Sequence, residues 1–457
     1  MGDSAPTNNW FPIIGTMSEA LSLRDQQFRQ MRDVAREIFA SALKKSSIES
    51  AFALDVSCER GVLRICEDLY DLDSYSRVLV FSIGKAAHTM AAALEAQVGS
   101  RLEGIVASSV PPAYQVRGFR YFQGGHPTPT AESLHAADAI LKSLNSLNAA
   151  SLVIFMLSGG GSSIVETPMD DEITFPDLAA TYRVLVHSGA PISEINAIRK
   201  HLSAVKGGRL AQAAYPGQQV SILVSDVPDA TPDALASGPT MPDSTSIADC
   251  ERIVARYGLL GQFPKSVADI FHQHVLEETP KSDDPAFVRA RWWTVLSNKV
   301  AVEQATIAAA RAGFAVEVDT SCDDWDYEKA ADYLVRRVRE LRKSDSRVCL
   351  ISGGEVTVNV RNGGTGGRNQ QFALSCAEKI AGEDITVLSA GTDGIDGNSP
   401  AAGAVVDGTT LQRAGQNAVP SALAGFNAYP LFEALGDAVM TGPTGNNLRD
   451  LRILLAY

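Results

Sequence analysis

The segment Leu152-Val-Ile-Phe-Met-Leu-Ser158-Gly-Gly-Gly-Ser-Ser163 joins an uninterrupted apolar run to a glycine-rich turn. Apolar runs of this length are typical of strands buried on both faces of a mostly parallel sheet. The glycines that follow let the backbone bend sharply where such a strand ends. In open α/β sheets the ligand crevice lies outside the carboxyl ends of the strands, so this turn is also a candidate binding site.

The same combination of short apolar runs and helical periodicity continues along the chain. A helix is predicted from Arg24, because Phe28, Met31, Ala35 and Ile38 recur at helical spacing. Further helices are predicted at 86–98, 300–312 and 327–341. The predicted strands are 77–83, 104–107, 152–157, 220–224, 293–296, 315–318, 348–351 and 385–388. Alternation of strands and helices favours the α/β fold class.

The strand signal stops between about residues 242 and 289, where helical patches surround a charged, proline-containing stretch. We therefore expect an α/β domain over residues 1–245, a helical connecting segment over 246–289 and a second α/β domain over 290–457. A length of 457 residues accommodates two such domains.

Composition excludes several classes of protein. The formal net charge of −13 argues against general binding to nucleic acid or anionic membranes, and no apolar run is long enough to cross a bilayer. The six cysteines are scattered and form no CxxC pair, which favours a reducing compartment. The N-terminus, which begins MGDSAPTNNW, lacks the features of a secretory or transit peptide, so we expect a cytoplasmic protein.

Two basic residues follow glycine turns at the expected strand ends. Lys85 opens an alanine-rich helix directly after a strand and Gly84, where the helix dipole and the lysine both attract an anion. Arg368 follows a second glycine-rich loop that contains Gly366 and Gly367, and it can grip phosphate or carboxylate with two donors. The alternatives are a solvated lysine and a flexible hairpin with an exposed arginine. We favour an anion site for both, although the Walker A pattern is absent.

The turn after the first quoted strand offers hydroxyl and backbone N–H groups to an anion. Its candidate binding residues are Ser158, Gly159, Gly160, Gly161 and Ser162. On this segment alone, an anion nest and an ordinary strand-to-helix turn are equally good interpretations. A serine-hydrolase elbow is excluded, because the pattern GxSxG does not occur.

Acidic residues also follow several predicted strands, notably Asp226, Glu355 and Asp393. Carboxylates at such positions can hold Mg²⁺ beside phosphate groups or accept a proton from a hydroxyl. Asp396 lies in an Asp-Gly turn and is equally consistent with a structural role.

Taken together, the ordered motifs resemble the class II glycerate 2-kinases, the family that carries a C-terminal MOFRL domain. The motifs that carry the resemblance are Ser82-Ile-Gly-Lys-Ala-Ala, Gly124-Gly-His-Pro-Thr-Pro, Leu157-Ser-Gly-Gly-Gly-Ser-Ser, Asn196-Ala-Ile-Arg-Lys-His-Leu-Ser, Lys206-Gly-Gly-Arg-Leu-Ala, Ser225-Asp-Val, Ser237-Gly-Pro-Thr, Ser352-Gly-Gly-Glu, Gly366-Gly-Arg-Asn-Gln, Gly391-Thr-Asp-Gly-Ile-Asp-Gly and Gly442-Pro-Thr-Gly-Asn-Asn.

The resemblance implies a kinase that uses ATP and Mg²⁺ to convert D-glycerate to 2-phosphoglycerate. It also implies a Rossmann-like first lobe, a smaller MOFRL-type second lobe and an active site in the cleft between them. The functional positions that it suggests are Lys85, Asp226, Glu355, Arg368 and Asp393, with Asn446 or Asn447 as a further polar contact.

Our working hypothesis is that Lys85 and Arg368 contact the transferring phosphoryl group and that Asp393 is the base. Asp226 and Glu355 then bind metal or substrate, although the three acids could exchange these roles. Two alternatives remain open from the sequence. One is an NAD(P)H-dependent hydroxypyruvate reductase, against which the lack of a GxGxxG turn between a strand and a helix argues. The other is a non-catalytic sensor of a sugar acid or nucleotide.

Overall fold

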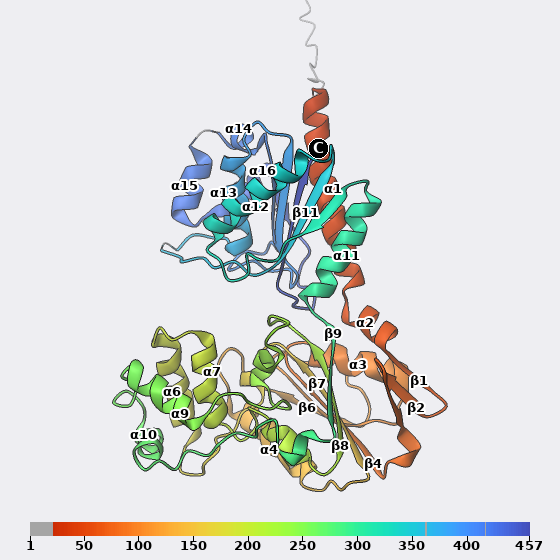
Figure 1. The fold of residues 1–457 in the computed structure, drawn as a ribbon, viewed down its shortest axis with the longest axis vertical. Coiled ribbons are helices and arrows are strands. Elements are labelled where there is room, and N and C mark those ends of the chain that lie inside the picture. The colour runs from red at the N-terminus through yellow and green to blue at the C-terminus, as the bar shows by residue number, and fades with distance from the viewer. Residues whose placement is uncertain (1–21, 362, 416) are drawn as a thin grey trace, which may run out of the picture.

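The computed structural model describes residues 22–361, 363–415 and 417–457. The first 21 residues, on which the expectation about a leader peptide rests, lie outside this part. Figure 1 shows two α/β domains that follow one another along the longest axis and are joined at one side. This arrangement confirms the predicted fold class. Within the described ranges, no helix is both long and apolar enough to cross a membrane.

The first domain contains a six-stranded sheet in which every neighbouring pair is parallel. Its order is β6-β5-β4-β7-β8-β9, which corresponds to the 3-2-1-4-5-6 order of Rossmann-type sheets. The order reverses between β4 and β7, so the loops after these two strands flank the switch point where ligands bind in such sheets. The strands are β4 (Arg77–Ile83), β5 (Glu103–Ser108), β6 (Phe119–Gln123), β7 (Ser151–Ser158), β8 (Gln218–Val224) and β9 (Ala290–Leu296).

Helices and a small sheet cover both faces of this sheet, which explains its continuous apolar strands. One face packs on α2 (Ile48–Asp55), α3 (Ala87–Val98) and an antiparallel sheet of β1 (Val56–Glu59), β2 (Val62–Ile65) and β3 (Asp68–Asp71). The other face packs on α4 (Ala131–Leu144), α5 (Gly161–Ile164) and α8 (Arg209–Ala214).

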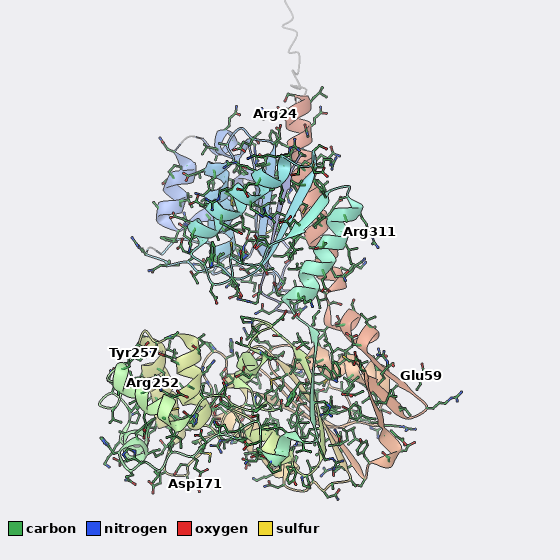
Figure 2. All side chains as sticks on the ribbon, in the orientation of Figure 1. Arg24, Glu59, Asp171, Arg252, Tyr257 and Arg311 are labelled. Atoms are coloured by element: carbon green, nitrogen blue, oxygen red, sulfur yellow. The ribbon has the colours of Figure 1, made fainter. Side chains whose placement is uncertain are left out.

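The segment expected to connect the two domains belongs instead to a helical group within the first domain. Its helices α9 (Ile247–Arg256) and α10 (Lys265–His272) share an apolar core with α6 (Phe175–His187) and α7 (Ile192–His201). Figure 2 places Arg252 and Tyr257 at the outer side of this group. The separate connecting segment predicted over 246–289 is therefore wrong, because its apolar faces are buried against earlier helices rather than spanning between domains.

The second domain contains a mixed sheet in the order β10-β11-β15-β12-β13-β14. Only β10 and β11 are parallel, and the other pairs are antiparallel. The central strand is the C-terminal β15, which the sequence analysis did not identify. The strands are β10 (Ala315–Val318), β11 (Val348–Gly354), β12 (Ile385–Gly391), β13 (Gly403–Asp407), β14 (Ala438–Val439) and β15 (Asp450–Ala456).

One face of the second sheet packs on four helices, namely α12 (Tyr327–Arg342), α13 (Arg368–Lys379), α15 (Ala418–Gly425) and α16 (Ala428–Leu435). The short helix α14 (Thr410–Ala414) contacts this group. The opposite face packs on α11 (Asn298–Arg311) and on the N-terminal helix α1 (Leu23–Lys45). Arg24 and Arg311 lie at the ends of α1 and α11 farthest from the first domain (Figure 2).

Two elements lie in the domain other than the one in which they were expected. Helix α1 was expected in the first domain, but its face of Phe28, Met31 and Ala35 is buried against the second sheet. Strand β9 was expected in the second domain, but it pairs with β8 as the edge strand of the first sheet. Sequence periodicity identifies such elements correctly, yet it does not say which sheet they join.

Candidate active site

The loops that follow β4 and β7 are joined by hydrogen bonds at the switch point of the first sheet. The Lys85 N–H donates to the Gly159 carbonyl at 2.9 Å, and the Ala86 N–H donates to the Ser158 hydroxyl at 3.1 Å. Gly84 has a φ of 128° and no room for a Cβ, which would lie 2.2 Å from Ser158 Oγ. The Lys85 side chain is exposed, so a charged amine stands at this edge.

The glycines of segment 158–162 make room for neighbouring functional groups. A Cβ at Gly159 would lie 1.9 Å from an oxygen of Asp226, and one at Gly160 would lie 3.1 Å from Lys85 Cγ. Two hydroxyls of the predicted nest are already engaged, since Ser158 accepts from Ala86 and Ser162 lies 2.7 Å from the Ser237 hydroxyl. Any anion bound at this turn would therefore meet backbone N–H groups rather than these hydroxyls.

Asp226 is the second residue of the loop after β8 and lies beside the glycine turn. Burial raises the pKa of its carboxyl group, and the positive charges of Lys85 and Arg449 partly offset the shift. Arg449 belongs to the second domain, so the environment of Asp226 includes charges from both sides. A half-buried carboxylate with this environment can exchange protons or hold a cation.

In the second domain, Arg368 at the first turn of α13 is held by two acids. Its Nη2 donates to Glu355 at 2.8 Å and to Asp450 at 2.9 Å, and its Nε donates to Asp450 at 2.7 Å. Burial alone would lower the pKa of Arg368, but the hydrogen bonds and charge of Asp450 outweigh it and raise the pKa. Burial also raises the pKa of Glu355, against the lowering influence of Arg368.

Asp393 lies in the loop after β12, where its carboxylate accepts the Ile395 N–H at 3.2 Å. Burial is the main cause of its raised pKa, and Asp450 adds to the shift while Arg368 and Lys85 oppose it. Lys85 is in the first domain, so the charge of that amine reaches across to this acid. The raised pKa brings Asp393 closer to the pH range in which a general base operates.

Asp396, three residues later, has the structural role that the sequence left open. Its carboxylate accepts the N–H groups of Asn369 at 3.0 Å and Gln370 at 2.8 Å, the first turn of α13. A Cβ at Gly367 would lie 2.3 Å from Asp396 Oδ1, so this glycine allows the close approach. Asp396 therefore caps α13, and burial raises its pKa to about 6.

Three further predicted residues make contacts inside the protein. The Gly366 N–H donates to Asn398 Oδ1 at 2.9 Å. Asn447 Oδ1 accepts the Arg449 N–H at 3.0 Å, which orients the segment before β15. Asn446 Nδ2 donates to the carbonyl of Ser46 at 2.8 Å, between α1 and α2, while its buried Oδ1 has no partner among the described residues. Asn446 thus links the second domain to one of the two chain connections.

Three functional candidates were missed by the sequence analysis. Asp450 is fully buried and orients Arg368. Arg449 pairs with Asp323, with Nη1 2.7 Å from Oδ2. Asn298, where the chain enters the second domain, accepts the Gly354 N–H at 2.9 Å and donates to the Leu448 and Asp450 carbonyls at 2.7 and 3.0 Å. The signal for the first two was available, because charged residues interrupt an otherwise apolar C-terminal run.

The structure brings Lys85, Asp226, Glu355, Arg368 and Asp393 to facing edges of the two domains. The acids of the two domains are close enough to interact electrostatically, since the negative charge of Asp226 raises the pKa of Glu355 across the domain boundary. A cavity of about 780 Å³ lies beside them, lined from the first domain by residues 227–230 and from the second by Asn298, Asp323 and Arg449, among others. The candidate site therefore lies in a cleft between the domains.

The residues present are compatible with a magnesium ion, which the family resemblance implies. Within the described residues, no group of three His, Cys, Asp or Glu side chains forms a ready metal cage. Mg²⁺ usually keeps several waters and is held by one or two carboxylates together with substrate phosphates. The electrostatically coupled carboxylates of Asp226 and Glu355 supply that kind of oxygen donor.

Comparison with known proteins gives two family matches and several full-length relatives. Residues 34–272 match "Domain of unknown function (DUF4147)", and residues 348–450 match the MOFRL family. A D-glycerate 2-kinase of Thermotoga maritima is 33% identical over 91% of this chain and 97% of its own. A relative from Agrobacterium vitis with a provisional hydroxypyruvate reductase name is 36% identical over 83% of this chain and 87% of its own.

A solved structure extends the likeness to the arrangement of both domains. The crystal structure of a glycerate kinase from Thermotoga maritima has a TM-score of 0.82 and 30% sequence identity, and the match covers 94% of this chain and 100% of that one. The ordered motifs, the two family matches and this shared two-domain fold all agree. The chain belongs to the MOFRL-containing family of glycerate 2-kinases.

Proposed function

We propose that this protein is an ATP-dependent glycerate kinase that transfers the γ-phosphoryl group to the 2-hydroxyl of D-glycerate. The observation that carries the proposal is the pairing of one cation and at least one partly buried acid on each side of the cleft. Lys85 and Asp226 face the cleft from the first domain, and Arg368, Glu355 and Asp393 face it from the second. Phosphoryl transfer depends mainly on such positioning and charge stabilisation.

Lys85 and Arg368 are proposed to neutralise charge on the transferring group from opposite sides. Asp450 and Glu355 occupy Nε and Nη2 of Arg368, and its Nη1 has no hydrogen-bond partner among the described residues. Nη1 is thus the end of the guanidinium proposed to meet phosphate. Lys85 carries a flexible, exposed amine that can follow the phosphoryl group.

Asp393 is proposed to accept the proton of the attacking hydroxyl, since its raised pKa suits a general base. Asp226 and Glu355 are proposed to hold Mg²⁺, which would neutralise phosphate charge when bound. Burial raises the pKa of both carboxyl groups, so protons compete with a cation for them at a higher pH than for exposed acids.

The choice of the 2-hydroxyl has a physical rationale. If the backbone of segment 158–163 grips the glycerate carboxylate, the adjacent carbon is held more rigidly than the terminal one. A rigidly held hydroxyl can be aimed at the phosphorus more accurately, and such positioning contributes strongly to rate.

The test is ADP formation that depends on D-glycerate, with ATP and Mg²⁺ supplied. Adding enolase without phosphoglycerate mutase then reports the position, because phosphoenolpyruvate forms only from the 2-phosphate. Appearance of phosphoenolpyruvate only after mutase is added would assign the 3-hydroxyl instead. NADH oxidation by hydroxypyruvate in the absence of any glycerate-dependent ADP formation would replace the kinase by a reductase.

A further inference from the structure

A second cavity, of about 530 Å³, extends from the candidate site into the second domain. Glu355 and Arg368 line the end that meets the site, and the rest of the wall comes from the same domain, including Val358, Val360, Gln371 and Phe426. This volume lies in the range of small-molecule and cofactor sites. Because one domain supplies all of its walls, the cavity keeps its shape when the two domains move.

One wall of this cavity is formed by residues 355–358 and Val360, where Thr357 makes an isolated parallel β-bridge with Asp326. The Thr357 N–H donates to Trp325 at 2.8 Å, and the Thr357 carbonyl accepts from Tyr327 at 3.1 Å. In extended backbone, consecutive residues direct their hydrogen-bonding groups to opposite edges. Val356 and Val358 therefore face the other way, and their backbone groups have no hydrogen-bond partner in the part of the chain that the structure describes.

Two apolar side chains in the lining of this cavity, Val360 and Phe426, are not fully covered by other residues. Val360 is 61% exposed, and the half-buried Phe426 lines the same cavity. Phe426 has a φ of 48°, which is uncommon for a bulky residue. A Cβ at Gly364 would lie 2.3 Å from the Phe426 carbonyl, so the glycine loop packs directly against this turn.

We propose that this cavity binds the base of the nucleotide, an inference that rests on the proposed kinase function. A nucleobase has apolar faces and a polar edge, which complement the Val360 and Phe426 side chains and the free backbone groups of Val356 and Val358. The triphosphate then runs past Gly364, Gly366 and Gly367, which line the cavity without side chains, and ends at Arg368. The end of the cavity at Arg368 thus suits the triphosphate of ATP, and the end at Val360 and Phe426 suits its base.

The other cavity beside the site is a poorer match to this ligand. It is larger and is lined by both domains, and the three carboxylates in its wall, those of Asp229, Glu303 and Asp323, outnumber its two cations, Lys299 and Arg449. Its Arg449 is already paired with Asp323. Acidic groups in that wall repel a polyanionic phosphate chain, so base binding there is disfavoured.

Photolabelling the full-length protein with 8-azidoadenosine triphosphate and Mg²⁺ tests the location directly. Label that unlabelled ATP competes away is expected on peptides within residues 355–367 or 418–427. Label on residues 227–230, 298–307 or 318–323 would overturn the inference and leave the kinase proposal standing. No ATP-protected label, together with no glycerate-dependent ADP formation, would reject both.

Two variants provide an independent kinetic test. Val360→Glu and Phe426→Ala are each expected to raise the KM for ATP about tenfold, because each removes or opposes apolar contact with the base. The kcat and the KM for glycerate should stay unchanged, which a general folding defect would not allow. Ile307→Glu is the matched control, because Ile307 is a 41% exposed apolar side chain in the other cavity, and it should leave the KM for ATP unchanged. If Ile307→Glu alone raised that KM, the base would lie in the other cavity.

Discussion

Asp450 holds Arg368 in a fixed orientation through two hydrogen bonds, from Nε at 2.7 Å and from Nη2 at 2.9 Å. Asp450 is the first residue of the central strand β15 and is fully buried. Arg368 is the first residue of α13 and directly follows the glycine-rich loop. Its hydrogen bonds to Asp450 therefore anchor the end of this loop to the central strand of the sheet. The guanidinium is thereby aimed before any ligand binds, which is what stabilisation of a transient charge requires.

Replacing Asp450 with Asn should lower kcat about 10- to 100-fold with little change in the KM for glycerate, since such supporting residues typically have effects of this size. The amide keeps the shape of the carboxylate but places N–H groups where Arg368 needs acceptors. The variant should also lower the pKa of Glu355, because Asp450 contributes to raising it. Steady-state kinetics across pH measure both effects, and an unchanged kcat with an unchanged acidic limb would contradict this role.

Lys85→Met should reduce kcat and kcat/KM together by about 100- to 1,000-fold, the effect typical of losing one donor to a developing charge. The exposed side chain contributes nothing to the core, so the fold should remain intact. Lys85→Arg is the matched control, because it retains the positive charge and should recover part of the activity. A rise in the KM for glycerate alone would instead make Lys85 a ground-state contact of the substrate.

The positions that the sequence identified correctly are those governed by local rules. Apolar runs identified the strands at 77–83 and 152–157, because strands covered on both faces are predominantly apolar. Glycine clusters identified the turns around Gly84 and Gly159, where the backbone must pass close to Ser158 and Asp226. Their clustering at strand ends then led to the candidate acids and bases.

The relationships that the sequence did not reveal are non-local. Asp450 lies 82 positions from Arg368 in the chain, and no local pattern links the two. Helix α1 has the periodicity of any amphipathic helix, yet its burial against the second sheet depends on a chain connection that periodicity does not encode. Asn446, which the family motif suggested as a substrate contact, donates to Ser46 between α1 and α2.

On acidification, kcat/KM should fall with a midpoint above pH 3.8, the ordinary pKa of aspartate, because burial raises the pKa of Asp393. This fall is the acidic limb of the pH profile. A base must be ionised to act, so a raised pKa means that activity is lost at a higher pH on acidification. Lys85 lowers the pKa of both Asp393 and Asp226, so the limb should move to still higher pH in Lys85→Met. The measurement is kcat/KM against pH for both proteins. A limb that shifts to lower pH in the variant would contradict the proposed coupling between these charges.

Asp396 gives a prediction about stability rather than rate. Its pKa is about 6 in the folded protein and 3.8 as an ordinary aspartate, so folding favours the protonated form. The stability contributed by that form is present below pH 3.8 and is lost as the pH rises through 6. Asp396→Asn should therefore gain stability relative to the native protein across this window, by at most about 3 kcal/mol for a shift of this size.

Denaturant unfolding of both proteins at several pH values between 4 and 7 measures that difference, and the range is set by the two pKa values. Asn cannot accept as many hydrogen bonds at the α13 terminus, which adds a loss that does not depend on pH. The informative quantity is consequently the change with pH and not the value at one pH. A difference that stays constant across the window would mean that Asp396 titrates at its ordinary value.

The final prediction concerns Asn298, at the point where the chain passes from β9 into the second domain. Its amide accepts the Gly354 N–H, next to Glu355, and donates to the Leu448 and Asp450 carbonyls. One side chain thus fixes the ends of β11 and β15, which carry the acids that orient Arg368. Asn298→Ala should lower the free energy of unfolding by about 1–3 kcal/mol, because three buried or half-buried backbone groups lose their partner.

The same change should lower kcat more than it alters either KM, since the loss of orientation affects the charged groups rather than the binding surfaces. Thr306→Ala, on the same helix, is the matched control, because its hydroxyl donates only to the Val302 carbonyl one turn earlier. Unfolding curves and kinetics for the two variants separate positioning from general destabilisation. If both variants were equally destabilised and equally active, Asn298 would be a helix contact without influence on the site, and the link between the chain connection and Arg368 would be removed.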